Sequence, residues 1–313
     1  MPELPEVETV RAGLAPALTG ATVTAVEVLD ERSLKRHPGG TRDFIDSLIG
    51  CRIEAVVRRG KFLWLPLTAP DARFAGEVAL VGHLGMSGQM LLRDTGAEPD
   101  KLTRVIMYAT EANGQPVEFR FVDQRIFGSL AIDDLVATND GKPGGFSAGV
   151  LADSPLRDRI PRSAAHIARD PLDADFDVAA VIAKFAKKNS GIKRVLLDQN
   201  LLSGIGNIYA DEALWRTRLH YDQPASSISK IKAKELLEHV RVILQDAVAE
   251  GGTSFDEQYK NVNGESGYFE VSLNAYGMTD RPCNRCGKAI KRDSWMNRGS
   301  HFCPNCQRLR KKA

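Results

Sequence analysis

Hydrophobic residues in the first 130 positions follow two different periods. Up to residue 18 they fall three or four positions apart, which is the spacing of one face of an α-helix. They are Val7, Val10, Leu14 and Leu18, with Pro16 inside the same stretch. From residue 22 onward they gather in short runs, several of which alternate with polar residues as a half-buried β-strand does. These runs cover residues 22–29, 52–58, 62–67, 78–84, 89–93, 103–109 and 117–122.

Turn-forming residues separate the runs, for example Gly50, Gly60 and the pair Asn113-Gly114. Many short strands at this spacing predict an antiparallel β-sandwich rather than a parallel sheet with helical crossovers. The N-terminal region is therefore expected to be one helix and a sandwich.

The second half of the chain has a different pattern. Residues 138–176 are rich in Gly and Pro and have little periodicity, which indicates a linker or an insertion. Apolar residues then return at helical spacing, most clearly between Lys230 and Glu250. We expect an α+β protein with four regions: the helix and sandwich (1–137), the linker or insertion (138–176), a helical domain (177–270) and a cysteine-containing module (271–313).

Composition narrows the class of protein. The chain has 313 residues, 43% hydrophobic and 26% charged, which suits a globular protein of about two domains. No run approaches the roughly 20 apolar residues that span a bilayer, and the N-terminus lacks the pattern of a signal peptide. We therefore expect a cytoplasmic protein with no membrane partner, in which cysteines bind metal or stay reduced.

The net charge of +2 conceals an uneven distribution. Residues 281–313 contain ten Lys or Arg and one acidic residue, whereas the other 280 residues contain 32 basic and 39 acidic ones. A small basic module on an acidic body is typical of nucleic-acid binding.

Four cysteines in this basic module have the spacing of a zinc site. Cys283 and Cys286 form one C-x-x-C pair, and Cys303 and Cys306 form another, with sixteen residues between the two pairs. Two such pairs complete a closed tetrahedral site, so we expect one structural zinc ion that holds a hairpin too small to fold alone. The fifth cysteine, Cys51, is expected inside a strand.

The N-terminus offers unusual nucleophilic chemistry. If Met1 is removed, Pro2 becomes a secondary α-amine, whose pKa near 8 leaves a useful fraction unprotonated at neutral pH. Condensed with an aldehyde-level carbon, this amine forms a cationic iminium, and Glu3 places a carboxylate beside it. The alternative is that Pro5 and the neighbouring acidic residues merely begin a helix.

Several glycine-containing loops carry groups suited to DNA. Asn207 follows two glycines at a helix start, where it could cap the helix and help bind an anion, and Arg298 lies between the two cysteine pairs. Met86 and Phe127 stand on loops beside glycines, where they would be core anchors or wedges between bases, and Arg125 could bond an unpaired base.

With these residues assembled, the chain closely resembles the formamidopyrimidine-DNA glycosylase family of bacterial repair enzymes. The resemblance runs from Pro2 to Cys306. It rests on the combination of the segments PELPEVE, RRGK, HLGMSG, DQRIFG, GIGNIY and NGESGYF with the C-terminal cysteines. It implies an N-terminal antiparallel β-sandwich, a helix–two-turn–helix domain and a zinc finger. It also implies a monomer that binds double-stranded DNA carrying oxidised bases or abasic sites.

The resemblance implies roles for individual residues. Pro2 would attack C1′ of an oxidised purine nucleotide such as 8-oxoguanine or a formamidopyrimidine, and β,δ-elimination through the Schiff base would cut the strand. Glu3 would be the acid–base partner and Lys61, in the RRGK turn, a catalytic lysine near the lesion. Asn207 and Arg298 would contact the phosphates that flank the lesion, and Tyr276 would contact the DNA backbone. The side chains that fill the space left by the flipped nucleotide would be Met86, Arg125 and Phe127. Residues 263–269 resemble a loop that closes over the flipped base.

Four points stay open from the sequence alone. Asn189 stands where the family often has a lysine linked to recognition of purine lesions, and the 138–176 segment is longer than the family minimum. The same Pro2-Glu3 chemistry would serve an endonuclease VIII-like enzyme for oxidised pyrimidines. A non-catalytic protein that binds damaged DNA is a further alternative, although retention of Pro2, Glu3 and Lys61 argues against it.

Overall fold

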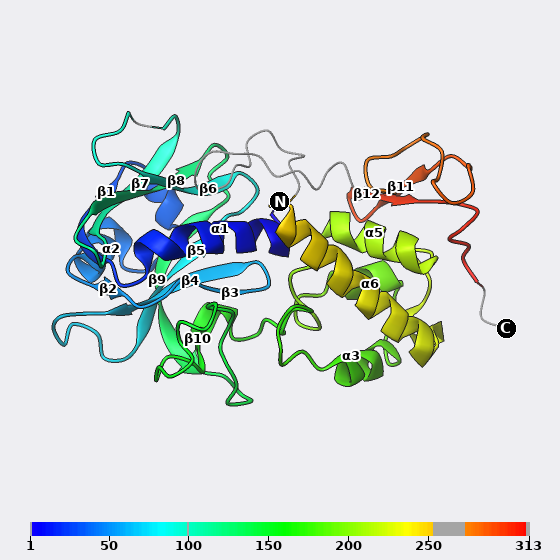
Figure 1. Ribbon diagram of the computed structural model, residues 1–313, viewed down its shortest axis with the longest axis horizontal. Helices are drawn as coiled ribbons and strands as arrows, with labels where there is room; N and C mark the ends of the chain where they lie inside the picture. Colours follow the sequence, from blue (N-terminus) through cyan, green and yellow to red (C-terminus); the bar gives the residue numbers. More distant parts are fainter. Residues whose placement is uncertain (1, 99, 253–272, 311–313) are drawn as a thin grey trace. The chain divides into compact units, whose positions relative to one another are not determined.

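The computed structural model describes residues 2–98, 100–252 and 273–310. They form two compact units, one of residues 2–98 and 100–166 and the other of residues 167–252 and 273–310 (Figure 1). The division falls inside the segment that the sequence indicates as a linker or insertion. None of the described helices is both long and apolar enough to cross a bilayer.

The first unit combines helix α1, Leu4–Leu18, with an antiparallel sheet. The strands are β1 Thr22–Val28, β2 Arg52–Ile53, β3 Val57–Arg59, β4 Phe62–Thr68, β5 Val78–His83, β6 Gly88–Arg93, β7 Thr103–Thr110, β8 Pro116–Asp123, β9 Ser129–Ala137 and β10 Arg159–Pro161. Their order is β10-β9-β5-β4-β2-β1-β7-β8-β6, with β3 paired to β4. The shorter helices are η1 Glu31–Leu34, α2 Gly40–Leu48 and η2 Arg162–Ala164.

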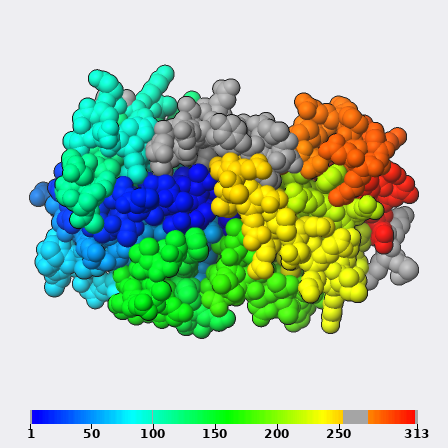
Figure 2. Space-filling view, in the orientation of Figure 1, coloured from blue at the N-terminus to red at the C-terminus, as the bar shows by residue number. Residues whose placement is uncertain are grey.

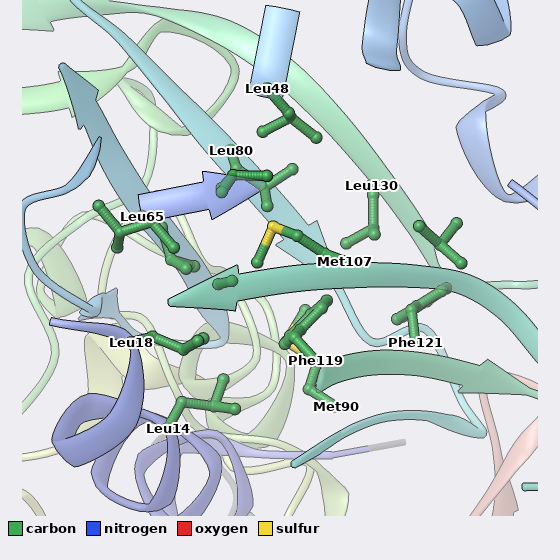
Figure 3. Close-up of a cluster of buried hydrophobic side chains, with 14 of the residues drawn as sticks. Leu14, Leu18, Leu48, Leu65, Leu80, Met90, Met107, Phe119, Phe121 and Leu130 are labelled. Carbon is green, nitrogen blue, oxygen red and sulfur yellow. The ribbon is translucent and has the colours of Figure 1, made fainter. Parts of the chain in front are cut away.

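The sheet folds over so that its two halves share one hydrophobic core (Figure 3). A Cβ atom on Gly82 of β5 would lie 2.0 Å from Cε of Met90 on β6, although these strands are far apart in the sheet order. Leu14 and Leu18 of α1 are fully buried in the same core. Burial of each such side chain contributes roughly 1.5–3 kcal/mol. The predicted helix and antiparallel N-terminal fold are confirmed.

The structure differs from the sequence pattern in three places. The run 52–58 is divided, because β2 and β3 are separate strands that both pair with β4. Strand β9 was not among the expected runs, although it pairs along its length with β5. Within residues 138–166, β10 pairs with the end of β9 and η2 follows it, so this segment contributes to the sheet of the first unit.

The second unit is helical, with one hairpin. Its elements are α3 Val178–Phe185, α4 Ile192–Leu196, α5 Asn207–Thr217, η3 Ala225–Ser227, α6 Lys230–Ala249, β11 Lys291–Trp295 and β12 Arg298–Phe302. Ser229 caps α6 by accepting a hydrogen bond from the backbone N–H of Lys232. The buried residues of α6 recur every three or four positions, as predicted, and the atoms of this helix that reach the surface are yellow in Figure 2.

Candidate functional site

The N-terminal candidates lie at the start of α1. Pro2 is buried and Glu3 is only 3% exposed. The backbone N–H of Glu3 donates to Oε2 of Glu6 at 2.8 Å, in a capping-box arrangement that fixes the residues entering the helix. The N-terminal end of a helix carries partial positive charge, which favours negatively charged side chains nearby. Met1 lies outside the described residues.

Lys61 occupies a two-residue turn between β3 and β4. Arg59 pairs with Phe62 across the turn, and Gly60 has a positive φ of 56°, which a tight hairpin requires. The two arginines before this turn are buried, with Arg58 2% and Arg59 6% exposed. Arginines at such a turn are usually solvated. Sequence reasoning missed this burial.

The Met86 loop and the loop that carries Arg125 and Phe127 lie against each other. Met86 is 38% and Phe127 52% exposed, which is high for large apolar side chains, and Arg125 is also exposed. Gly85 has φ of 63°, and a Cβ atom on it would lie 2.5 Å from the backbone nitrogen of Gly128. The two loops therefore touch through their backbones and present three candidate DNA contacts together.

Asp123, which sequence reasoning did not single out, ties these loops. Its carboxylate is fully buried and accepts from Ser87 Oγ at 2.6 Å, from the Arg125 backbone N–H at 3.1 Å and from the Gly128 backbone N–H at 2.7 Å. One carboxylate thus satisfies donors from both loops and fixes their separation.

His83 supports the start of the Met86 loop. Its Nδ1 accepts a hydrogen bond from the backbone N–H of Gly85 at 3.1 Å, so that nitrogen is unprotonated. Burial, together with the nearby Arg36 and Lys35 charges, lowers the pKa of His83 to about 4. The ring is therefore neutral near pH 7.

In the second unit, a hydrogen bond connects Asn207 to Gly299, the residue after Arg298. Nδ2 of Asn207 donates to the carbonyl of Gly299 at 3.1 Å. Arg298 is exposed and begins β12, after a two-residue turn from Trp295. The expectation that Asn207 caps α5 is wrong, because Gly206 is the N-cap and Asn207 is the first helical residue.

A buried ion pair anchors this hairpin to the helices. Lys193 is fully buried, and its Nζ lies 2.6 Å from Oδ1 of Asp211 and 3.1 Å from Oγ of Ser300. Asp211 also accepts from the backbone N–H of His301 at 2.9 Å. The pair joins α4 and α5 to β12, so it positions Arg298; no local sequence signal identifies it.

Glu212 holds the residues before the cysteines. It accepts hydrogen bonds from the backbone N–H groups of Asn274, Ala275 and Tyr276 at 2.7 to 3.1 Å. Burial raises the pKa of Glu212. The ring of Tyr276 packs edge-on against His301, with centroids 4.8 Å apart, so Tyr276 lies beside the β12 hairpin. The candidate loop 263–269 lies outside the described residues.

The four cysteine sulfurs form one cluster. All four Sγ atoms lie within 4.8 Å of one another, and those of Cys286 and Cys303 are 3.5 Å apart. A tetrahedral Zn–S₄ centre with bonds of about 2.3 Å places its sulfurs roughly 3.8 Å apart, so the cluster fits such an ion. The β11–β12 hairpin runs between the two cysteine pairs.

Comparison with known proteins covers nearly the whole chain. A model of the formamidopyrimidine-DNA glycosylase N-terminal domain matches residues 1–130, one of the H2TH domain of that enzyme matches 167–258, and one of a zinc finger found in FPG and IleRS matches 281–309. The formamidopyrimidine-DNA glycosylase of Leifsonia xyli is 55% identical over 309 residues, which is 99% of this chain and 100% of that protein.

Solved structures agree with these matches. One is MutM in complex with DNA containing carbocyclic 8-oxo-G, with a TM-score of 0.77, 29% identity and coverage of 98% of this chain and 100% of that one. Another is Lactococcus lactis FPG in complex with DNA containing an oxidised pyrimidine, with a TM-score of 0.76 and the same identity and coverage.

Proposed function

Because the chain belongs to the formamidopyrimidine-DNA glycosylase family, and is therefore a DNA glycosylase, we propose that it removes oxidised purines from duplex DNA and cleaves the resulting abasic site. The preferred substrates are 8-oxoguanine and formamidopyrimidines. The match over the full chain, with Pro2 and Glu3 retained at the start of α1, is the observation that supports this proposal.

The chemistry begins at the amine of Pro2. Its nitrogen attacks C1′, the damaged base leaves with the bonding electrons, and the opened sugar is held as an iminium. The cationic nitrogen acidifies the C2′ proton, whose loss expels the 3′ phosphate in the β-elimination. A second elimination expels the 5′ phosphate and leaves a one-nucleotide gap. Glu3 moves protons at the sugar, and Lys61 acts beside the lesion.

DNA would be held by residues of both units. Asn207 and Arg298 bind phosphates that flank the lesion, where a rigid guanidinium suits an anion, and Tyr276 contacts the backbone nearby. Met86 and Phe127 fill the space left by the flipped nucleotide, and Arg125 bonds the base opposite it. The exposure of these three side chains on two tied loops supports their role.

The metal and the assembly are part of the proposal. One zinc ion is held by the thiolates of Cys283, Cys286, Cys303 and Cys306, where it would fix the hairpin and take no part in the reaction. The protein acts as a monomer in the cytoplasm.

A second candidate substrate class is oxidised pyrimidines. The complex of Lactococcus lactis FPG with DNA containing an oxidised pyrimidine favours it. Asn189 favours it too, because it stands where the family often has a lysine linked to recognition of purine lesions. The loops bearing Met86, Arg125 and Phe127 favour the purine assignment.

Borohydride trapping tests the mechanism and the substrate together. Protein shown to begin at Pro2 is mixed with duplexes that carry 8-oxoguanine opposite C, 8-oxoguanine opposite A, or thymine glycol. We expect a covalent adduct on Pro2, strongest for 8-oxoguanine opposite C. Stronger trapping on thymine glycol would move the preference to pyrimidines, whereas absence of any adduct would leave a damaged-DNA-binding protein. Protein with a chemically blocked N-terminus is the control.

A further inference from the structure

A buried ion network joins α1 to the strand before Lys61. Oε2 of Glu8 lies 2.8 Å from Nε of Arg58, and its Oε1 lies 2.9 Å from both Nε and Nη2 of Arg11. All three side chains are buried, with at most 10% of their surface exposed. Nη1 of Arg58 also donates to the carbonyl of Gly60 at 3.3 Å, inside the turn that contains Lys61. The network therefore links the first turns of α1 to this turn.

The network joins the guanidinium groups of Arg11 and Arg58 to the carboxylate of Glu8. The ring of Phe146 lies against both guanidinium groups. Its centroid lies 5.1 Å from Cζ of Arg11 and 6.0 Å from Cζ of Arg58, within the range of cation–π attraction. Phe146 is 47% exposed, so burial in a core does not account for its position.

The backbone of Phe146 is hydrogen-bonded to β3. The N–H of Arg58 donates to the carbonyl of Phe146 at 3.0 Å, and the N–H of Phe146 donates to the carbonyl of Arg58 at 2.7 Å. Nη2 of Arg59 donates to the carbonyl of Pro143 at 3.1 Å. Residues 143–146, called the bracing segment below, thus lie against β3, and Phe146 pairs with Arg58 on the side of β3 that faces away from β4.

Two glycines allow this close approach. A Cβ atom on Gly145 would lie 2.5 Å from the ring of Trp64 and 2.6 Å from the carbonyl oxygen of Arg58. A Cβ atom on Gly144 would lie 1.8 Å from the carbonyl oxygen of Arg159. Any other residue at 145 would push the bracing segment away from β3, and any other residue at 144 would push it away from the start of β10.

Strand β3 needs this support, because it has three residues and pairs with β4 alone among the strands of the described sheet. With the bracing segment on its other side, β3 is held on both edges. Its exit turn, which contains Lys61, is then fixed relative to α1 through Glu8.

We propose that Phe146 and the bracing segment are positioning elements that set Lys61 against the N-terminal residues of α1. This inference rests on the proposed function, in which Pro2 and Lys61 act on the same nucleotide. It gives a role to the insertion between residues 138 and 166, which the sequence left without one.

The test compares Phe146→Leu, which keeps an apolar side chain but removes the aromatic face, with Phe146→Tyr, which keeps that face. Single-turnover rates of strand scission are measured on an 8-oxoguanine·C duplex, and affinity is measured on a duplex with an uncleavable abasic analogue. Small misplacements of reacting groups lower rates by factors of ten to a hundred. We expect Phe146→Leu to lower the rate about tenfold with affinity unchanged within twofold, and Phe146→Tyr to retain the wild-type rate.

A matched control is Val150→Ala, since Val150 is equally exposed in the same insertion and should leave the rate unchanged. Gly145→Ala is an independent variant that displaces the segment without altering the ring, and it should lower the rate as Phe146→Leu does. Thermal unfolding of each variant is recorded in parallel.

Equal rates for wild type, Phe146→Leu and Gly145→Ala would overturn the inference. So would a rate loss in Phe146→Tyr as large as that in Phe146→Leu, because the ring face would then be irrelevant. If wild-type protein beginning at Pro2 forms no borohydride adduct, the proposed function itself fails. A wild-type adduct on Pro2 with an unaffected Phe146→Leu rate defeats the positioning role alone.

Discussion

At the scale of single residues, buried carboxylates hold the candidate DNA contacts of each unit. Asp123 in the first unit and Asp211 in the second are at most 1% exposed, and each accepts hydrogen bonds from more than one segment. A buried charge is costly unless such donors satisfy it. Each carboxylate therefore fixes its donors at one separation, and loss of the charge should loosen the surface that it supports.

Asp123→Asn tests this argument in the first unit. The amide group that replaces one oxygen would face a backbone or hydroxyl donor, so at least one hydrogen bond to Ser87, Arg125 or Gly128 is lost. We expect a loss of about 2 kcal/mol in the free energy of unfolding, measured by urea denaturation. Asp134→Asn is the control, because Asp134 pairs only at the exposed surface with Arg162 and should change stability little. A variant as stable as wild type would show that the loops do not depend on the carboxylate.

The lowered pKa of His83 predicts how the stability of the protein depends on pH. Its pKa of about 4 in the folded protein lies below the ordinary value of 6.5, so folding favours the neutral ring. The stability that this provides is complete above pH 6.5 and is lost as pH falls from 6.5 towards 4. Relative to His83→Gln, wild-type protein should lose about 1–2 kcal/mol of unfolding free energy between pH 7 and pH 5. Parallel pH profiles for the two proteins would contradict the assignment.

At the scale of elements, short pieces of structure depend on partners outside themselves. The β11–β12 hairpin has five residues in each strand, too few for independent stability. Its supports are the cysteine cluster and the buried contact of Lys193 with Asp211. Because Arg298 begins β12, the position of a candidate phosphate contact depends on both supports.

Removing the metal tests the contribution of the cysteine cluster independently of the contact between Lys193 and Asp211. A chelator that strips the proposed zinc should increase hydrogen exchange at the backbone of residues 291–302 while leaving the sheet of the first unit protected. Affinity for an abasic-analogue duplex should fall at least tenfold, about 1.4 kcal/mol or more. Metal analysis of the untreated protein should give one zinc per chain, also in Cys51→Ser, because Cys51 is buried apart from the cluster. Unchanged affinity after complete metal loss would show that Lys193 and Asp211 suffice.

Local spacing predicted some elements well and could not predict others. The apolar residues of α6 recur every three or four positions and the cysteines stand in pairs three positions apart, so the sequence alone revealed both features. The contact of Glu8 with Arg58 spans 50 residues, and no periodicity marks it. Strand β9 was missed because its adjacent Asp133 and Asp134 interrupt the apolar pattern, although β5 pairs with both. Pairing between distant segments is decided by the fold as a whole.

At the scale of the whole molecule, the basic module and the exposed candidate DNA contacts Met86, Arg125 and Phe127 lie in different units. The basic module that includes Arg298 belongs to the second unit, whereas Arg125 and its neighbours belong to the first. Phosphate contacts supply affinity that is independent of sequence and falls with salt, while contacts to bases supply discrimination. The proposed function therefore assigns the two arginines effects that can be measured separately.

Arg298→Gln and Arg125→Gln should change different properties of binding. Each phosphate contact contributes about 0.9 to the slope of log affinity against log salt concentration. We expect Arg298→Gln to reduce that slope by about one and to weaken binding equally whichever base lies opposite the lesion. Arg125→Gln should keep the slope and reduce the preference for C over A opposite 8-oxoguanine by about tenfold, since one lost bidentate base contact corresponds to roughly 1–3 kcal/mol. Arg162→Gln, at an exposed ion pair, is the control and should change neither property. Matching changes in slope and preference for both candidate variants would contradict this division, because both arginines would then contact the same part of the DNA.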